Sequence, residues 1–181
     1  MEQSYGFVEG DSASVAELLC LLSAIAGIPL RQDIAVTGSV NQWGRVQAVG
    51  GINEKVEGFY DVCREVTFTG KQGICLPEAN VRNMILRPDV LEAIDEGTFH
   101  IWPVKTVDEA LNLLSGVPAG DLTEKDTFHN AVDRRFRQMM ATLKEERAPF
   151  GPPSSVAVES STPGQRDPRP PLPGRDTIVP D

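Results

Sequence analysis

The first strong pattern in the chain is an apolar helix. Apolar residues surround most of the girth of a helix predicted over residues 12–26, which indicates that this helix is buried. Asp11 or Ser12 is the expected N-terminal cap, and Gly27 followed by Pro29 ends the helix. A buried helix of this kind needs a sheet or other helices to pack against.

Shorter apolar runs and turn residues follow in alternation. Strands are predicted at 34–37, 46–49, 66–68, 73–76 and 99–104, with a hairpin turn at 38–44 between the first two. Helices are predicted at 53–64, 89–96 and 107–114, and a turn or helix start at 77–84. Thr106 and Glu109 form a capping box for the helix that follows them. This alternation predicts a mixed α/β domain over residues 1–120.

The remainder of the chain differs in character. A helical extension is predicted within 121–147, where Phe128, Val132, Phe136, Met139 and Met140 form an apolar stripe expected to pack on the domain or on a neighbouring subunit. Nine of the 14 prolines lie in 148–181. Such a segment buries too little apolar surface to offset the entropy of ordering, so we predict a disordered tail. A polyproline helix at 168–173 that docks in an aromatic groove is the alternative.

Composition narrows the classes of partner. The net charge is −9 and the pI about 4.7, which disfavours nucleic acid and anionic membranes as partners. No secretory signal is visible at the N-terminus, and the apolar stretch 15–30 is too short to span a bilayer. The cysteines, Cys20, Cys63 and Cys75, have no metal or redox spacing and are expected to be buried free thiols. We therefore expect a cytoplasmic protein without a metal site.

The sharpest chemical hypothesis is a Ser–Lys pair. Ser12 lies directly before helical backbone, whose free N–H groups and dipole favour a developing oxyanion. Lys55 lies at the start of a helix after Gly50-Gly51, where burial and the positive end of the dipole favour the neutral amine that a general base requires. The structural alternatives are an ordinary helix cap at Ser12 and a solvent-facing Lys55 paired with Glu54 or Glu57.

Three further residues can support this pair. Thr37 ends a predicted strand, and its hydroxyl is a candidate to hydrogen-bond the neutral amine of Lys55 and to aim it. Glu9 and Asp11 flank the serine and can orient either member of the pair. Surface caps are the alternative role for both acids. Neither His100 nor His129 lies in a motif that indicates triad chemistry.

Several motifs in order resemble one family. The segments Glu-Gly-Asp-Ser-Ala-Ser (9–14), Thr-Gly-x5-Gly-x-Val (37–46) and Val-Gly-Gly-Ile-x-x-Lys (49–55) are similar to the proteolytic domain of Lon proteases. Gly-Ile-x-Leu-Pro-Glu-x-Asn (73–80) and Val-Asp-Glu-Ala-Leu (107–111) continue the likeness, which covers residues 6–116. The form before the serine resembles the LonB and LonC-type branches, because the bacterial LonA form has proline there.

The resemblance implies a Lon proteolytic-domain fold, related to the second domain of a ribosomal small-subunit protein. It implies Ser12 as nucleophile, Lys55 as general base and Thr37, Asp11 and Glu9 as supporting residues. It also implies a homo-hexamer that degrades unfolded or damaged polypeptides, with ATP and Mg²⁺ used by an ATPase module. No phosphate-binding loop occurs here, so no cofactor is expected in this chain. The family's upstream strands are missing, which predicts a fragment or a truncated relative.

Three alternatives stay open at this point. Lon-like domains also serve as ring-forming scaffolds without a working dyad, although both dyad positions are filled in this chain. A fragment with a complete but misaligned dyad is the second alternative. A different Ser–Lys hydrolase, such as an amidase, is the third, and the order of the motifs disfavours it.

Overall fold

A computed structural model describes residues 10–66 and 68–147 of the chain. Its centre is a parallel sheet with the strand order β1-β4-β5, formed by β1 (Ile34–Val36), β4 (Gly73–Pro77) and β5 (His100–Val104). Ile34 pairs with Gly73, and Gly73 pairs with His100. All five positions of β4 are buried, as expected for the middle strand of a parallel sheet that is covered on both faces.

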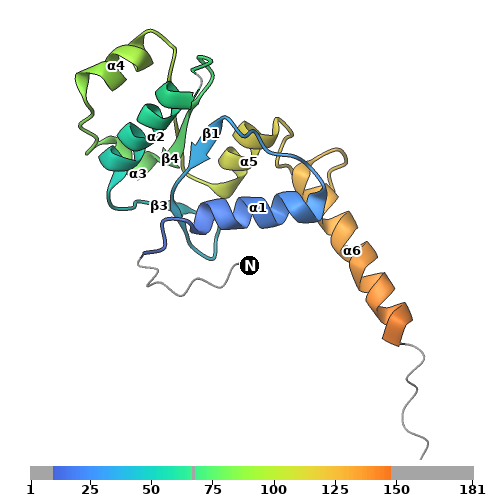
Figure 1. Ribbon diagram of the computed structural model, residues 1–181. Helices are drawn as coiled ribbons and strands as arrows, with labels where there is room; N and C mark the ends of the chain where they lie inside the picture. The colour runs from blue at the N-terminus through green and yellow to red at the C-terminus, as the bar shows by residue number, and fades with distance from the viewer. Residues whose placement is uncertain (1–9, 67, 148–181) are drawn as a thin grey trace, which may run out of the picture.

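Helices cover both faces of this sheet (Figure 1). One layer contains α1 (Ser14–Ala26), α5 (Val107–Ser115) and the start of α6 (Phe128–Arg147). The other contains α2 (Ile52–Val66) and α4 (Pro88–Asp95). Side chains alternate between the two layers along β4: Cys75 packs with the first layer, whereas Ile74 and Leu76 pack with the second. The predicted mixed α/β fold class is thus confirmed.

The predicted helices are present, with small shifts at their ends. Gly27 and Gly116 end α1 and α5 in the left-handed conformation, as their positions predict. Thr106 caps α5, because its hydroxyl accepts the backbone N–H of Glu109 at 3.2 Å. The cap predicted for the first helix is wrong: the N-cap is Ala13, without a side-chain cap.

One predicted strand has a different partner, and another is absent from the described residues. The hairpin is β2 (Ser39–Val40) with β3 (Val46–Gln47), and the run at 34–37 does not take part in it, because β1 pairs with β4 instead. The strand predicted at 66–68 is also wrong, since Val66 ends α2 and Phe68 belongs to no strand. Both apolar side chains there are exposed, Val66 at 77% and Phe68 at 37%, so neither belongs to a buried strand. Tyr60 and Phe68 meet edge to face, with ring centroids 5.7 Å apart.

Helix α6 leaves the body of the molecule (Figure 1). Its first residue, Phe128, is fully buried, and Val132 packs on the core beside α1. The rest of its apolar stripe does not pack on the domain, because Phe136, Met139 and Met140 are 42–55% exposed. The other predicted partner of the stripe, a neighbouring subunit, stays a prediction. Residues 148–181 lie outside the described part of the chain, so the predicted tail and the division at residues 120 and 147 stay predictions.

Two compositional expectations have different outcomes. Cys63 and Cys75 are buried free thiols, but Cys20 is exposed on α1, so the expectation of burial is wrong for that residue. Among the helices of the described segments, none combines the length and the apolar character that crossing a membrane requires.

Candidate active site

Ser12 lies in the turn that leads into α1, half-buried and held by its backbone. Its carbonyl oxygen accepts the Gly38 N–H at 2.8 Å and the Thr37 hydroxyl at 3.3 Å. One turn later, the Val15 N–H donates to the carbonyl of Gly38 at 3.2 Å. The start of α1 is thus fixed against the segment that follows β1.

Gly38 permits this close approach. A methyl group at its Cα would lie 3.1 Å from Val46 Cγ1 and 3.2 Å from Val15 Cγ2, which is too close without a shift of either side chain. The glycine therefore lets three elements meet beside Ser12: the start of α1, the end of β1 and the β2–β3 hairpin. The same glycine belongs to the Thr-Gly motif noted in the sequence.

Polar side chains complete the attachment on both sides of Ser12. The Asp11 carboxylate accepts the Ser39 hydroxyl, and Ser39 is buried. The Ser14 hydroxyl accepts the Val40 N–H at 3.0 Å. Neither Ser39 nor Ser14 is predictable as part of this site from the sequence, because a serine in a short strand or helix gives no signal until its partner is known. Glu9, the other predicted acid, lies outside the described residues.

The amides available to an oxyanion differ from the expected ones. The Ser14 N–H donates to the Asp11 carbonyl at 3.0 Å, and the Val15 N–H is engaged by Gly38. Among the residues that the structure describes, the N–H groups of Ser12 and Ala13 have no hydrogen-bond partner. Those two amides flank the serine side chain, so they are the better candidates to hold a negative oxygen near it.

Lys55 lies in the first turn of α2 and is half-buried. Its amine donates to the carbonyl oxygen of Gly50, with Nζ and O 3.0 Å apart. Neither Glu54 nor Glu57 forms an ion pair with it across residues 10–66 and 68–147, so the simple salt-bridge alternative is not what the structure contains.

The predicted site residues come together in part. Thr37 holds Ser12 through the serine's carbonyl, and Asp11 is anchored beside it. Within the described segments, no hydrogen bond joins Lys55 to Ser12 or to Thr37, so the expected contact between the threonine hydroxyl and the amine is not formed. Catalytic hydrogen bonds are often long or poorly aligned without substrate, so this geometry is compatible with a Ser12–Lys55 pair.

The sheet explains why both residues lie where they do. Ser12 is attached to Thr37 and Gly38, directly beyond the carboxyl end of β1. The chain before Lys55 is attached beyond the carboxyl end of β4, where Asn80 contacts Val49. Because β1 and β4 are parallel neighbours, both attachments are at the same edge of the sheet. In open α/β sheets this edge is where ligands bind.

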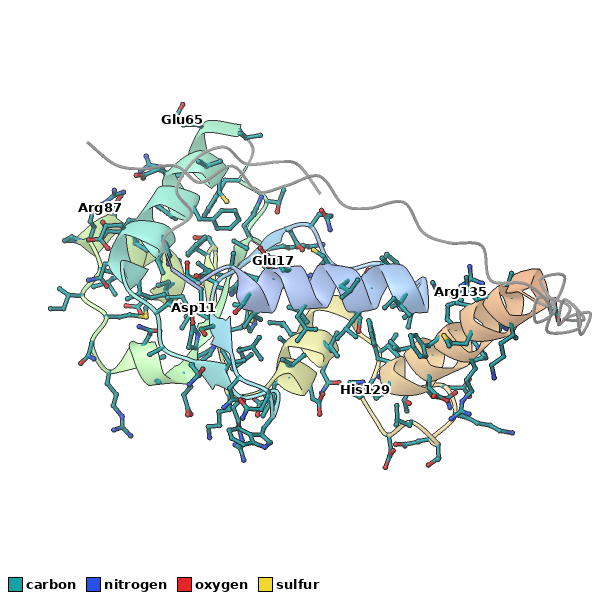
Figure 2. The ribbon with its side chains drawn as sticks, turned by 90° about the horizontal axis from the view of Figure 1, so that it is seen from below. Asp11, Glu17, Glu65, Arg87, His129 and Arg135 are labelled. Carbon is teal, nitrogen blue, oxygen red and sulfur yellow. The ribbon has the colours of Figure 1, made fainter. Side chains whose placement is uncertain are left out.

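Other candidate nucleophiles and bases are less suited to the chemistry. Burial raises the pKa of the Cys75 thiol to about 12, so it is not a thiolate near neutral pH. His100 contacts the Gly70 carbonyl, and His129 pairs with Asp108 at 2.8 Å. Figure 2 shows Asp11 at one end of α1 and His129 beyond the other end, so this histidine lies far from the start of the helix.

The described ranges contain no cluster of three or more His, Cys, Asp or Glu side chains that is suited to a metal ion.

Comparison with protein families identifies a match over most of the folded part. Residues 7–115 match the model of the Lon protease (S16) C-terminal proteolytic domain. The matched segment includes both Ser12 and Lys55, as well as the sheet edge at which they are attached.

Individual relatives agree with this match. The chain is 46% identical over 149 residues to a putative Lon protease homolog of Escherichia coli (strain K12), covering 82% of this chain and 25% of that protein. It is 47% identical over 140 residues to a putative Lon protease homolog of Haemophilus influenzae, covering 75% and 23%. An archaeal Lon protease of Thermococcus kodakarensis is 37% identical over 111 residues, covering 61% and 16%. The chain thus spans about a quarter or less of the length of these relatives.

Proposed function

Because this chain belongs to the family of Lon protease (S16) C-terminal proteolytic domains, we propose that it is a serine endopeptidase domain in which Ser12 and Lys55 form the catalytic dyad. The observation that carries the proposal is their common placement. Each residue lies at the start of a helix, and both helix starts are attached to the carboxyl edge of the same parallel sheet.

In the proposed acylation step, the neutral amine of Lys55 takes the proton of the Ser12 hydroxyl, and the serine oxygen attacks the peptide carbonyl carbon. The carbonyl of Gly50 accepts one N–H of the amine, which leaves the nitrogen lone pair for the serine proton. The N–H groups of Ser12 and Ala13 stabilise the oxyanion. The lysine then protonates the leaving amine, and the first product departs.

Deacylation uses the lysine in the same two roles. The neutral lysine takes a proton from water as the water oxygen attacks the acyl-enzyme carbonyl, and when the second oxyanion collapses the lysine returns that proton to the departing serine oxygen, which releases the carboxylic acid and the free serine. No metal or cofactor is required by either step. The same lysine thus serves as base and acid in both halves of the reaction.

The cellular setting follows from the family resemblance. We propose that unfolded or damaged polypeptides are the substrates, that the domain works in the cytoplasm as part of a homo-hexamer, and that a separate ATPase module supplies the substrate. The part of the E. coli relative that this chain leaves uncovered, about three quarters of its length, supports the separate module. ATP and Mg²⁺ belong to that module in this account.

Substitution of the lysine tests the chemistry. Lys55→Ala and Lys55→Arg should each lower the rate of peptide-bond cleavage in an unfolded protein substrate by roughly 10⁴-fold, because neither alanine nor a permanently charged arginine takes a proton from serine. Cleavage is measured by mass spectrometry of the products, and the fold by circular dichroism.

Lys144→Ala is the matched control, because this lysine is exposed on α6 and takes no part in the proposed site; it should cleave like the wild type. Full activity in Lys55→Arg would contradict the dyad. An inactive wild type that remains folded would favour a dormant, scaffold-like domain instead.

A further inference from the structure

Asn80 connects the two halves of the candidate site. It belongs to α3 (Glu78–Val81), the short helix directly after β4, and it is one of the buried polar residues, at 7% exposure. Its side-chain oxygen accepts the Val49 N–H at 3.0 Å, and its side-chain nitrogen donates to the Val49 carbonyl at 2.8 Å. Both the oxygen and the nitrogen of the carboxamide therefore form hydrogen bonds with the backbone of Val49, which is distant in the sequence.

The carboxamide suits this task because it carries one acceptor and one donor in a plane. It meets the N–H and the C=O of Val49 as a neighbouring strand would. Because the Val49 N–H requires an acceptor and its C=O requires a donor, the orientation of the amide follows from its partners. No smaller side chain reproduces both bonds, and a carboxylate keeps only the accepting one.

Val49, the residue that Asn80 holds, lies shortly before Lys55 in the chain. Val49 is followed by Gly50 and Gly51, which have no side chains with which to anchor the segment, and then by α2. The carbonyl of Gly50 accepts the Lys55 amine. The position of that carbonyl, and with it the position of the amine, thus depends on how Val49 is held.

The same strand also fixes the serine. Within β4, the Cys75 carbonyl accepts the Thr37 N–H at 3.0 Å, and Thr37 in turn holds the carbonyl of Ser12. Five residues after Cys75, Asn80 holds the segment that leads to Lys55. A single rigid element, β4 with its short helix, therefore sets the relative position of the two proposed catalytic side chains.

We infer that Asn80 is a positioning residue for the proposed dyad, which acts by holding the Val49–Gly51 segment that precedes Lys55 and so sets the position of the lysine relative to Ser12. This inference rests on the proposed peptidase function. Small displacements of a catalytic group of this kind reduce turnover by about 10²-fold. They leave the binding of substrate nearly unchanged, because Asn80 is buried below the site rather than exposed to a substrate.

The test compares Asn80→Ala, Asn80→Asp and the wild type in steady-state cleavage of a fluorogenic peptide across a pH series. Asn80→Ala should lower kcat by about 10²-fold with KM within about twofold, and it should move the rising limb of the pH–rate profile. If Asn80→Ala merely reduced the amount of folded protein, the rates would fall by the same factor at every pH and the rising limb would stay at the same pH. The kcat of Asn80→Asp, which keeps the bond to the Val49 N–H, should lie between that of Asn80→Ala and that of the wild type.

Asn112→Ala is the matched control. It removes an asparagine hydrogen bond of 2.6 Å, from Ala119 N–H to Asn112 Oδ1, in the opposite helical layer, and it should leave kcat and the pH–rate profile as in the wild type. Hydrogen exchange supplies a readout that does not need activity: the amides of 49–55 should exchange faster in Asn80→Ala than in Asn112→Ala.

The outcomes separate the two levels of the account. An active wild type with unchanged kcat, pH–rate profile and exchange in Asn80→Ala would overturn the positioning role and leave the peptidase intact. A folded wild type without any peptide cleavage would overturn the peptidase, and the positioning role with it. A shifted profile in Asn80→Ala, absent from Asn112→Ala, supports the inference.

Discussion

The residues around Ser12 are held chiefly through backbone groups. Thr37 is 7% exposed, and its hydroxyl donates to the carbonyl of Ser12 rather than to the lysine amine. Gly38 adds a second hydrogen bond to the same carbonyl. A carbonyl fixed at two points limits the rotation of the serine backbone and so restricts where its side chain and its amide lie. Thr37 therefore has a testable role in the proposed site even without a contact to Lys55.

Replacement of this hydroxyl is the first prediction at the residue scale. Thr37→Val has nearly the same shape but loses the hydrogen bond to Ser12, so kcat for peptide cleavage should fall by about tenfold, the rate equivalent of one hydrogen bond worth about 1.4 kcal/mol. The measurement is steady-state cleavage at a temperature where circular dichroism shows both proteins folded.

Thr37→Ser is the matched control, because it keeps the hydroxyl and loses a methyl group. It should retain most of the wild-type rate. If Thr37→Val and Thr37→Ser were equally impaired, packing of the methyl group rather than the hydrogen bond would be responsible.

Residue types and spacing made Ser12, Lys55 and Thr37 candidates, but they did not predict the contacts of these residues. Asp11 was expected to cap α1, yet its carboxylate accepts the buried hydroxyl of Ser39. That partner is 28 positions away in the chain, so local propensity contains no information about it. Asn80 shows the same limit: its motif was visible in the sequence, but its role depends on where Val49 lies.

At the scale of elements, α2 and α4 are joined by a charged cluster. Arg87, which precedes α4, donates to the carboxylates of Asp61 on α2 and Asp89 on α4, with closest N–O distances of 2.6 and 3.0 Å. Its backbone N–H also donates to Glu57 on α2 at 2.9 Å. The hydrogen bonds from Arg87 lower the pKa of Asp61 and of Asp89 below their ordinary value of 3.8.

This cluster predicts a pH dependence of stability. A carboxylate whose pKa is lowered by folding stabilises the native state above its unfolded pKa, and the stabilisation is lost as pH falls through the folded pKa. Arg87→Gln should therefore reduce the free energy of unfolding near neutral pH by a small amount, because the charges are partly exposed. The difference from the wild type should shrink below about pH 4.

Urea unfolding at a series of pH values measures this difference. Arg82→Gln is the matched control, since Arg82 is exposed and forms no ion pair in the described part of the chain. A difference between Arg87→Gln and the wild type that stays constant from pH 7 to pH 3 would contradict the assignment.

Elements with clear boundary residues were predictable, and those defined by distant pairing were not. Helix α5 has the Thr106 cap and the Gly116 stop, and both function as predicted. The run at 34–37 looked like half of a hairpin, but its partner is β4, about 40 residues further on. The strand predicted at 66–68 was wrong because a short apolar run does not by itself specify a strand. Val66 is instead the exposed last residue of α2.

At the scale of the whole molecule, the sheet organises the candidate site. Two helical layers lie on opposite faces (Figure 1), and each contributes one member of the proposed dyad from a helix start at the carboxyl edge of the strands. The alternation of strands and helices in the sequence predicted the fold class. The pairing of Ser12 with Lys55 was predicted from the family resemblance, and their attachment at one edge of the sheet came from the structure, because periodicity does not specify which strands are neighbours.

The exposed part of α6 shows that a hydrophobic pattern does not identify the partner of an apolar helix face. The spacing of Phe136, Met139 and Met140 correctly indicated an amphipathic helix, but not that this stripe projects beyond the domain. An amphipathic pattern specifies that a face is apolar and leaves its partner undefined.

The most direct test of the central claim is covalent labelling of the serine. The wild type, Ser12→Ala and Lys55→Ala are incubated with a serine-acylating probe, and the intact masses are measured. The dyad predicts one added acyl group on the wild type, mapped to Ser12 by peptide sequencing, and none on either variant. Labelling of Ser12 at the same rate in Lys55→Ala, or no labelling of a folded wild type, would contradict it.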